Sequence, residues 1–337
     1  MKKIVISDEY NEIDLRPFDL FKRYIQLTEK DVDVYFPKHA LKDSPCPGCR
    51  GKNGKASFAK LGMQYVECPD CSKLYVSPRP DDAALNGYYA KSAARDYWRD
   101  ELSKKTNRKR QDKIIRPRFD WILDSTQENL PEAEHIVDVN TEQYGYIDEL
   151  LDNAFFTRKT LLNPRIRLDD AALSGRINIL NASLDPAPLK NGADVVSIFE
   201  VADNAGDVDA LFAALRAMLK KNGLCFMTDI LISGFDLQTL WDKAENIFPP
   251  DRLNVFTVEG LRALFKRHDF ECLEFSTPGI LDVELVETAV RHNPEIKLSR
   301  PMEYMLRSRG AESKTLFQEF LQENLLSSYA RIVLRKK

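Results

Sequence analysis

The chain has 337 residues, of which 43% are hydrophobic and 30% are charged, and its formal net charge is −3 at pH 7. This length and this apolar content suffice for one large folded domain with a small appended module, so a globular protein is expected. The nearly neutral charge provides no overall field that would attract nucleic acid or an anionic membrane.

We expect no secretion signal among the N-terminal residues. Two lysines are followed by Asp8 and Glu9 before an adequate apolar run develops. No uninterrupted apolar stretch reaches the roughly 18 residues that a membrane-spanning helix needs. We therefore expect a cytoplasmic protein without a membrane span, in a compartment where thiols stay reduced.

Two short segments precede the main domain. Residues 1–42 mix charged and aromatic residues without a clean period, which predicts a short helical or irregular lead-in. A cysteine-containing module over residues 43–80 follows. It ends at Ser77-Pro78-Arg79-Pro80, where the prolines interrupt regular structure.

The module contains two Cys-x-x-Cys pairs separated by eighteen residues, which is the spacing of a zinc ribbon. Each tight pair delivers two thiolates, and the apolar segment between the pairs is suited to a hairpin. Because four thiolates fill the coordination shell, we predict a structural rather than a catalytic zinc. The predicted ligands are Cys46, Cys49, Cys68 and Cys71. The other two cysteines, Cys225 and Cys272, lie in apolar runs and are expected to be buried.

Residues 81–131 have a polar, helical pattern and form a predicted helical connector. Lysine and arginine residues are dense between positions 104 and 118. A solvated helix face, or one that contacts an anionic small substrate, is the favoured interpretation. Nucleic acid is the weaker alternative, since Asp112 and Asp120 are interspersed and stacking aromatic residues are not regularly interleaved. The basic residues are Lys104, Lys105, Arg108, Lys109, Arg110, Lys113, Arg116 and Arg118.

From residue 132 to 337, short apolar runs alternate with helical stretches, which predicts a parallel sheet flanked by helices. Residues 208–219 have the spacing of an amphipathic helix, and Asn222-Gly223 is expected to end it. Thr257 is the predicted N-cap of a further helix. The predicted strands are 135–140, 158–163, 176–181, 194–200, 224–230, 270–276 and 328–335.

The order of these elements resembles that of class I S-adenosylmethionine (SAM)-dependent methyltransferases that carry an N-terminal zinc ribbon. The resemblance implies an α/β fold with a Rossmann-like seven-stranded sheet, flanked by helices, in which one strand near the C-terminus is antiparallel. It also implies a sugar, a nucleotide-sugar or a related small metabolite as the acceptor. The segments that carry the likeness, besides the cysteines, are 75–80, 194–201, 219–224 and 253–261.

The resemblance places the cofactor after the first strand of that sheet, where the family has an acidic residue followed by alternating glycines. Here the segment 138–146 reads Asp-Val-Asn-Thr-Glu-Gln-Tyr-Gly-Tyr. The leading acid is kept, but Glu142 and Tyr144 occupy positions where glycine would let the backbone approach the ligand. Asn163 stands where the family uses an acid to bind the ribose hydroxyls, and Asp203-Asn204 stands near where a Glu-His pair is common. The candidate cofactor residues are Asp138, Asn140, Gly145, Asn163 and Glu200.

Two functions of different class follow, and the sequence assigns no catalytic residue. In the first, the protein is an active methyltransferase with an atypical cofactor loop. In the second, it is a catalytically inactive protein that keeps the fold to bind a partner protein or another ligand, as a regulatory subunit would.

Overall fold

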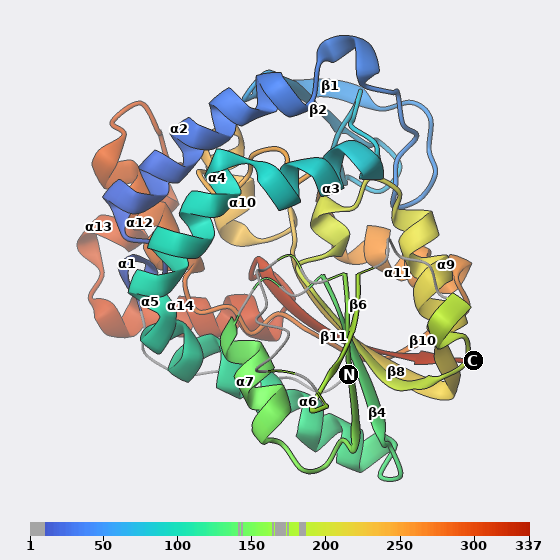
Figure 1. The fold of residues 1–337 in the computed structure, drawn as a ribbon. Coiled ribbons are helices and arrows are strands. Elements are labelled where there is room, and N and C mark those ends of the chain that lie inside the picture. Colours follow the sequence, from blue (N-terminus) through green and yellow to red (C-terminus); the bar gives the residue numbers. More distant parts are fainter. Residues whose placement is uncertain are drawn as a thin grey trace.

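A seven-stranded sheet forms the centre of the computed structural model, which describes residues 11–140, 142, 144–163, 165, 173, 175–181 and 187–337 (Figure 1). The strand order is β10-β11-β8-β7-β4-β5-β6. Strand β11 runs antiparallel to both of its neighbours, and the other adjacent pairs are parallel. The predicted α/β fold is therefore confirmed. The strands are β4 (His135–Val139), β5 (Arg158–Leu162), β6 (Asn178–Leu180), β7 (Ala193–Phe199), β8 (Leu219–Ile230), β10 (Phe270–Ser276) and β11 (Tyr329–Lys336).

Helices cover both faces of the sheet because successive strand residues point to opposite sides and both sides are apolar. On one face, Ile136 and Val195 pack against α6 and α7. On the other face, Val137 and Val196 pack against α9 and α11. All four side chains are fully buried, and each burial contributes about 1.5–3 kcal/mol. The helices are α6 (Arg116–Asn129), α7 (Tyr144–Asp152), α9 (Val208–Met218) and α11 (Val258–Arg267).

Two helix boundaries test the sequence signals. Thr257 caps α11 as predicted, since its hydroxyl accepts a hydrogen bond from the Gly260 amide at 3.0 Å. The prediction that Asn222-Gly223 ends α9 is wrong, because that helix already ends at Met218. Asn222 has a φ of 64° inside β8, beside an irregularity in the pairing of β7 with β8. The Asn-Gly pair therefore lies at an irregularity within the strand and does not end a helix.

The two remaining cysteines differ in exposure. Cys225 is buried in the central strand β8, as expected. Cys272 is exposed, so the prediction of burial is wrong for this residue. Strand β10 lies at the edge of the sheet, where a side chain has fewer neighbours to cover it.

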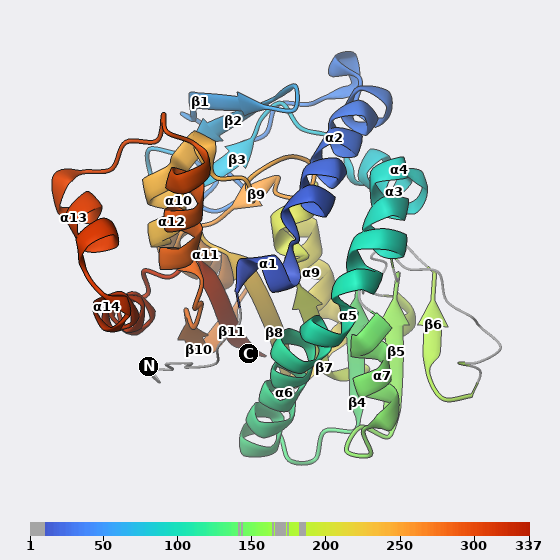
Figure 2. The ribbon, with the colours of Figure 1, turned by 90° about the vertical axis from the view of Figure 1, so that its left-hand side faces the viewer.

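A second, four-stranded sheet carries the cysteine pairs and lies above the first one in Figure 2. Its order is β1-β2-β3-β9, with every pair antiparallel. Strand β9 comes from the C-terminal half of the chain, so residues nearly 180 positions apart complete this sheet. The strands are β1 (Lys55–Lys60), β2 (Met63–Glu67), β3 (Leu74–Val76) and β9 (Asn254–Val255).

Helices from both ends of the chain form a layer over one edge of the large sheet (Figure 1). They share an apolar cluster that includes Tyr24, Leu74, Phe248 and Val283. Within the described ranges, none of the helices is long and apolar enough to cross a membrane. The helices are α1 (Glu12–Leu15), α2 (Phe18–Tyr35), α3 (Asp82–Lys91), α4 (Ala93–Tyr97), α5 (Lys104–Arg110), α10 (Phe235–Leu240), α12 (Asp282–His292), α13 (Arg300–Ser308) and α14 (Ala311–Glu323). Short 3₁₀ turns are η1 (Lys38–Ala40), η4 (Ala187–Leu189), η5 (Ala202–Asn204) and η6 (Trp241–Lys243).

Helix α5 is joined to its neighbours by two π-helical segments, so that α4 to α6 form one continuous helical run. These segments are η2 (Trp98–Ser103) and η3 (Gln111–Ile115). Segments of this kind widen a helix locally and are frequent at functional sites. Both segments contribute side chains to the wall of the main cavity.

Candidate functional site

A cavity of about 510 Å³ lies over the carboxyl ends of β4 and β7. Its wall includes Asp138 and Asn140 from the end of β4, and Phe199 and Glu200 from the end of β7. Ligands of open α/β sheets bind at this edge, where the strand order reverses direction. The volume lies within the range of small-molecule sites.

Asp138, the acid predicted to mark the cofactor loop, lies at the floor of this cavity. Its side chain is only 2% exposed and accepts a hydrogen bond from the Ser197 hydroxyl at 3.3 Å. Tyr146 donates to the same hydroxyl at 3.0 Å, which orients Ser197 toward the carboxylate. The acid is therefore held in place by neighbouring strands and by helix α7.

Asn140 and Asn163 are brought together. The Asn163 Nδ2 donates to the Asn140 Oδ1 at 2.9 Å, and both residues have left-handed backbone angles, with φ of 51° and 56°. Asparagine tolerates this conformation better than most residues. Asn140 lines the cavity, whereas Asn163 follows β5 just outside the wall. Gly145 also lies outside it, in the first turn of α7, where its carbonyl accepts from the Gln111 side chain at 3.3 Å.

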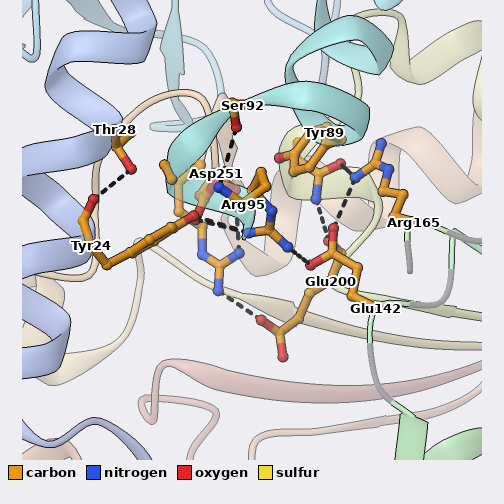
Figure 3. Close-up of polar contacts among 12 residues, drawn as sticks. Tyr24, Thr28, Tyr89, Ser92, Arg95, Glu142, Arg165, Glu200 and Asp251 are labelled. Atoms are coloured by element: carbon orange, nitrogen blue, oxygen red, sulfur yellow. Dashed lines mark hydrogen bonds and ion pairs between the residues drawn. The ribbon is translucent and has the colours of Figure 1, made fainter. Parts of the chain in front are cut away.

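Glu142 occupies a loop position where the related family has glycine. Its carboxylate lies 2.5 Å from the Arg95 guanidinium of α4 and 3.4 Å from that of Arg165 (Figure 3). Arg165 lies over the Tyr89 ring at 3.8 Å and donates to the Asn204 side chain at 2.9 Å. Ion pairs therefore hold the loop that glycines would otherwise shape. The neighbouring Thr141 and Gln143, and the side chain of Tyr144, lie outside the described part of the chain.

Glu200 belongs to a second ion-pair network. Its carboxylate is 2.8 Å from Arg252 and 3.5 Å from Arg118. Burial alone would raise the pKa of Glu200, but the two guanidinium groups outweigh it and lower this pKa to about 2. Arg252 also contacts the buried Asp203 at 2.5 Å. Glu200 is therefore ionised and already paired, rather than an open acceptor for a ligand.

A third set of polar contacts ties helix α2 to the cavity (Figure 3). Tyr24 donates to Asp251 at 2.6 Å and accepts from Arg95 at 2.9 Å. Thr28 donates to the Tyr24 carbonyl at 3.0 Å. The N-terminal helices thus form one wall of the site instead of a separate appendage.

The basic stretch 104–118 splits into two faces. One group of side chains lies in the cavity wall, and three of the other four form ion pairs with acids on the outer surface. A solvated face and a face toward the cavity therefore coexist on the same helical run. The cavity group is Lys104, Arg110, Lys113 and Arg118, and the outer group is Lys105, Arg108, Lys109 and Arg116.

The four predicted zinc ligands converge at the second sheet. Their sulfur atoms lie within 4.8 Å of one another, with Cys46 and Cys71 3.6 Å apart and Cys49 and Cys68 3.5 Å apart. Thiolates at about 2.3 Å from a tetrahedral zinc would be about 3.8 Å apart, so the arrangement fits one such ion. Lys73 is buried near this cluster and donates to the Asn254 side chain at 3.4 Å, and burial lowers the pKa of its amino group well below the usual value.

The cysteine cluster is connected to the cavity through β9. The Val76 amide of β3 donates to the Leu253 carbonyl at 2.9 Å, and Tyr65 donates to the Arg252 carbonyl at 2.6 Å. The buried Asn254 accepts from Arg79 at 2.9 Å. The ribbon therefore positions the segment that carries Arg252 into the cavity.

Three arginines that form ion pairs with Glu142 or Glu200 were not identified from the sequence, namely Arg95, Arg165 and Arg252. Arg252 carries the clearest signal, since Pro-Pro-Asp-Arg at 249–252 sets two charges between apolar neighbours. Arg95 lies in a polar helical segment that contains many charges, and nothing nearby distinguishes it. Their partners lie 23 to 52 positions away in the sequence.

Residues 127–274 match the family model of a methyltransferase domain. The matched segment contains β4 to β9 and most of β10, and therefore most of the large sheet. It also contains all five candidate cofactor residues. The cysteine module and most of the helical connector lie outside it. No curated protein matches the chain significantly.

Solved structures with similar folds are distant in sequence. A 1,6-didemethyltoxoflavin-N1-methyltransferase of Burkholderia thailandensis, with bound S-adenosylhomocysteine, is 11% identical, with a TM-score of 0.43 over 84% of this chain and 99% of that one. A SAM-dependent methyltransferase of Thermotoga maritima is 16% identical, with a TM-score of 0.40 over 70% and 98%. The YcgJ protein of Bacillus subtilis is 7% identical, with a TM-score of 0.43 over 66% and 99%.

Proposed function

We propose that this protein is a SAM-dependent methyltransferase that acts on a small metabolite of the sugar or nucleotide-sugar type. The cavity carries the proposal. It opens at the carboxyl ends of β4 and β7, in the segment that matches a methyltransferase domain, and it has the volume of a small-molecule site.

Two residues fit the cofactor by their chemistry and place. The buried Asp138 carboxylate offers an acceptor for the ammonium group of the methionine portion. Asn163 donates through Nδ2 to Asn140, which leaves Oδ1 as the atom that accepts from a ribose hydroxyl. Bound SAM supplies a methyl group already activated by its sulfonium, so positioning carries much of the rate. The chain's own task is then to orient the acceptor and to exclude water.

A structural zinc completes the proposal. Four thiolates would close its coordination shell and leave no position for water, so the ion would take no part in the reaction. The ion would fix the position of β3. Because β3 pairs with β9, it would also help to fix the position of Arg252, which precedes β9.

One observation favours the alternative, a catalytically inactive protein that binds a partner or another ligand. Glu142 fills a position of the cofactor loop with a side chain that is already paired to Arg95 and Arg165. If these contacts persist in solution at all ligand concentrations, the loop has no room for the methionine portion of SAM.

Calorimetric titration with SAM and S-adenosylhomocysteine separates the two functions. We expect micromolar binding of both, weakened at least about tenfold by Asp138→Ala, since a lost hydrogen bond to a charged group costs about 1.5–3 kcal/mol. Asp120→Ala, at an exposed position of α6, is the matched control and should bind as the unaltered protein does. A folded protein that produces no heat with either compound at millimolar concentration would refute the enzyme and favour the inactive protein.

A further inference from the structure

The wall of the cavity is strongly cationic. Within the described part of the chain, ten lysine and arginine side chains and five carboxylates line it. Three of the cations, Arg99, Lys104 and Arg252, also pair with the carboxylates of Asp96, Asp100 and Asp203 outside the wall. Several of the carboxylates are already paired, as Glu142 is with Arg95 and Arg165. The excess is concentrated where the helical run α5 to α6 meets the end of α1.

Arg110 is at the centre of this excess. Its guanidinium donates to the Leu15 carbonyl at 2.6 Å and to the Thr106 hydroxyl at 2.8 Å, both of them neutral acceptors. It also lies 5.4 Å from the centre of the Trp98 ring. Burial and the nearby Arg16 lower the pKa of Arg110 to about 10. Arg110 forms no ion pair with a described residue, and an anion would relieve its repulsion from Arg16 and Arg118.

Glu200 is an acid whose charge acts on Arg110, and it is shared. Its carboxylate faces both Arg252 and Arg118, at 2.8 and 3.5 Å. Arg118 is almost fully buried, with its guanidinium 4.7 Å from the centre of the Phe199 ring. One carboxylate thus serves two guanidinium groups, and neither Arg16 nor Arg110 forms an ion pair with it.

One π-helical segment places a cationic side chain in the wall of the cavity. Segment η3 contains Lys113, which lines the cavity and is only partly exposed, and segment η2 contains Trp98. On the same helical run, Lys105 is 60% exposed and pairs with Glu101 on the outer surface. The local widening of the helix therefore accompanies a division between ligand-facing and solvent-facing lysines.

We propose that Arg16, Arg110, Lys113 and Arg118 form a subsite for the phosphate or diphosphate group of the acceptor. A phosphoryl group brings up to two negative charges and three acceptor oxygens, which suit converging guanidinium and ammonium donors. That the anion belongs to a methyl acceptor rests on the proposed function, while the subsite itself can be tested without SAM.

Calorimetric titration with pyrophosphate and with inorganic phosphate, in the absence of SAM, tests the subsite. We expect both anions to bind, pyrophosphate more tightly, and Lys113→Met to weaken the binding at least about tenfold. Lys105→Met removes the same charge from the same helical run and should change the affinity less than about twofold. Thermal unfolding of both variants checks that each is folded, and neither position is in the apolar core.

The subsite would be overturned if neither anion produced heat, or if Lys113→Met and Lys105→Met lowered the affinity for pyrophosphate equally. It would also be overturned if L-methionine bound in a Lys113-dependent way while pyrophosphate did not bind. The last result would assign the cluster to the carboxylate of the cofactor. Failure of the subsite is distinguishable from failure of the proposed function, because S-adenosylhomocysteine binding is measured separately. A protein that binds pyrophosphate but not S-adenosylhomocysteine would support the anion subsite and refute the proposed methyltransferase function.

Discussion

Replacing Arg252 by methionine measures what the ion-pair network beside the cavity contributes to stability. Arg252 contacts Glu200 at 2.8 Å and Asp203 at 2.5 Å, and its side chain is only 17% exposed. Removing one partner of a buried ion pair costs about 3–5 kcal/mol. Because 34% of the Glu200 side chain is exposed, solvent screens part of this loss, and we expect about 3 kcal/mol at pH 7.

The pH dependence separates the charge effect from lost packing. Arg252 and Arg118 hold the pKa of Glu200 at about 2, against its burial. A carboxyl group whose pKa is lowered by folding stabilises the protein above its unfolded pKa of about 4.3, and this stability is lost as the pH falls toward the folded value. The difference between the unaltered protein and Arg252→Met should therefore narrow from pH 7 to about pH 4.

Urea denaturation followed by tryptophan fluorescence gives the free energy of unfolding at both pH values. Arg307→Met is the matched control, since it removes an exposed pair with Glu303 at 2.9 Å and should cost less than about 1 kcal/mol. A cost below about 1 kcal/mol for Arg252→Met, or a cost that does not change with pH, would refute the reasoning.

Two further substitutions test the buried acid and the metal. Burial raises the pKa of Asp229 to about 7, so its stabilising contribution is present below its unfolded pKa of about 3.9 and is lost as the pH rises to about 7. Asp229→Asn should therefore raise the free energy of unfolding by about 2–3 kcal/mol more at pH 8.5 than at pH 5, unlike the exposed Asp112→Asn. An equal gain at both pH values would contradict this. Cys68→Ser should lower the metal content from about one zinc per chain to near zero, and it should weaken S-adenosylhomocysteine binding because the cysteine module pairs with a segment of the cavity wall. Cys272→Ser, at an exposed position, is the control and should have neither effect. An unaltered protein without zinc, or a Cys68→Ser protein that keeps its zinc, would disprove the metal site. A metal-free Cys68→Ser protein that binds S-adenosylhomocysteine normally would disprove its connection to the cavity.

The strands could be predicted because each is a short apolar run buried on both faces. Residues of β4 and β7, such as Val137 and Val196, point into one helical layer, and their neighbours Ile136 and Val195 point into the other. Such runs are recognisable without knowledge of the partners. The cysteine cluster was equally accessible, since the ligands come in two local pairs whose spacing is set by tight turns.

The contacts that shape the cavity could not be predicted in the same way. Glu142 was recognised as an unusual loop residue, but its partner Arg95 lies 47 positions earlier, in a helix with many other charges. The junction of β3 with β9 joins Tyr75 to Asn254. The Glu142–Arg95 ion pair and the β3–β9 pairing both depend on how the helical layer and the cysteine module pack against the large sheet. No local sequence pattern encodes that packing. The family comparison does not supply it either, because it begins at residue 127.

The location of S-adenosylhomocysteine in crystals grown at saturating ligand tests the central claim most directly. We predict ligand density in the cavity over the carboxyl end of β4. The amino group of the ligand should lie on Asp138 and its ribose beside Asn163 at the border of the cavity, with Glu142 turned away from Arg95. Crystals that show no ligand in the cavity, with Glu142 still bridging Arg95 and Arg165, would contradict the assignment of this protein as a methyltransferase.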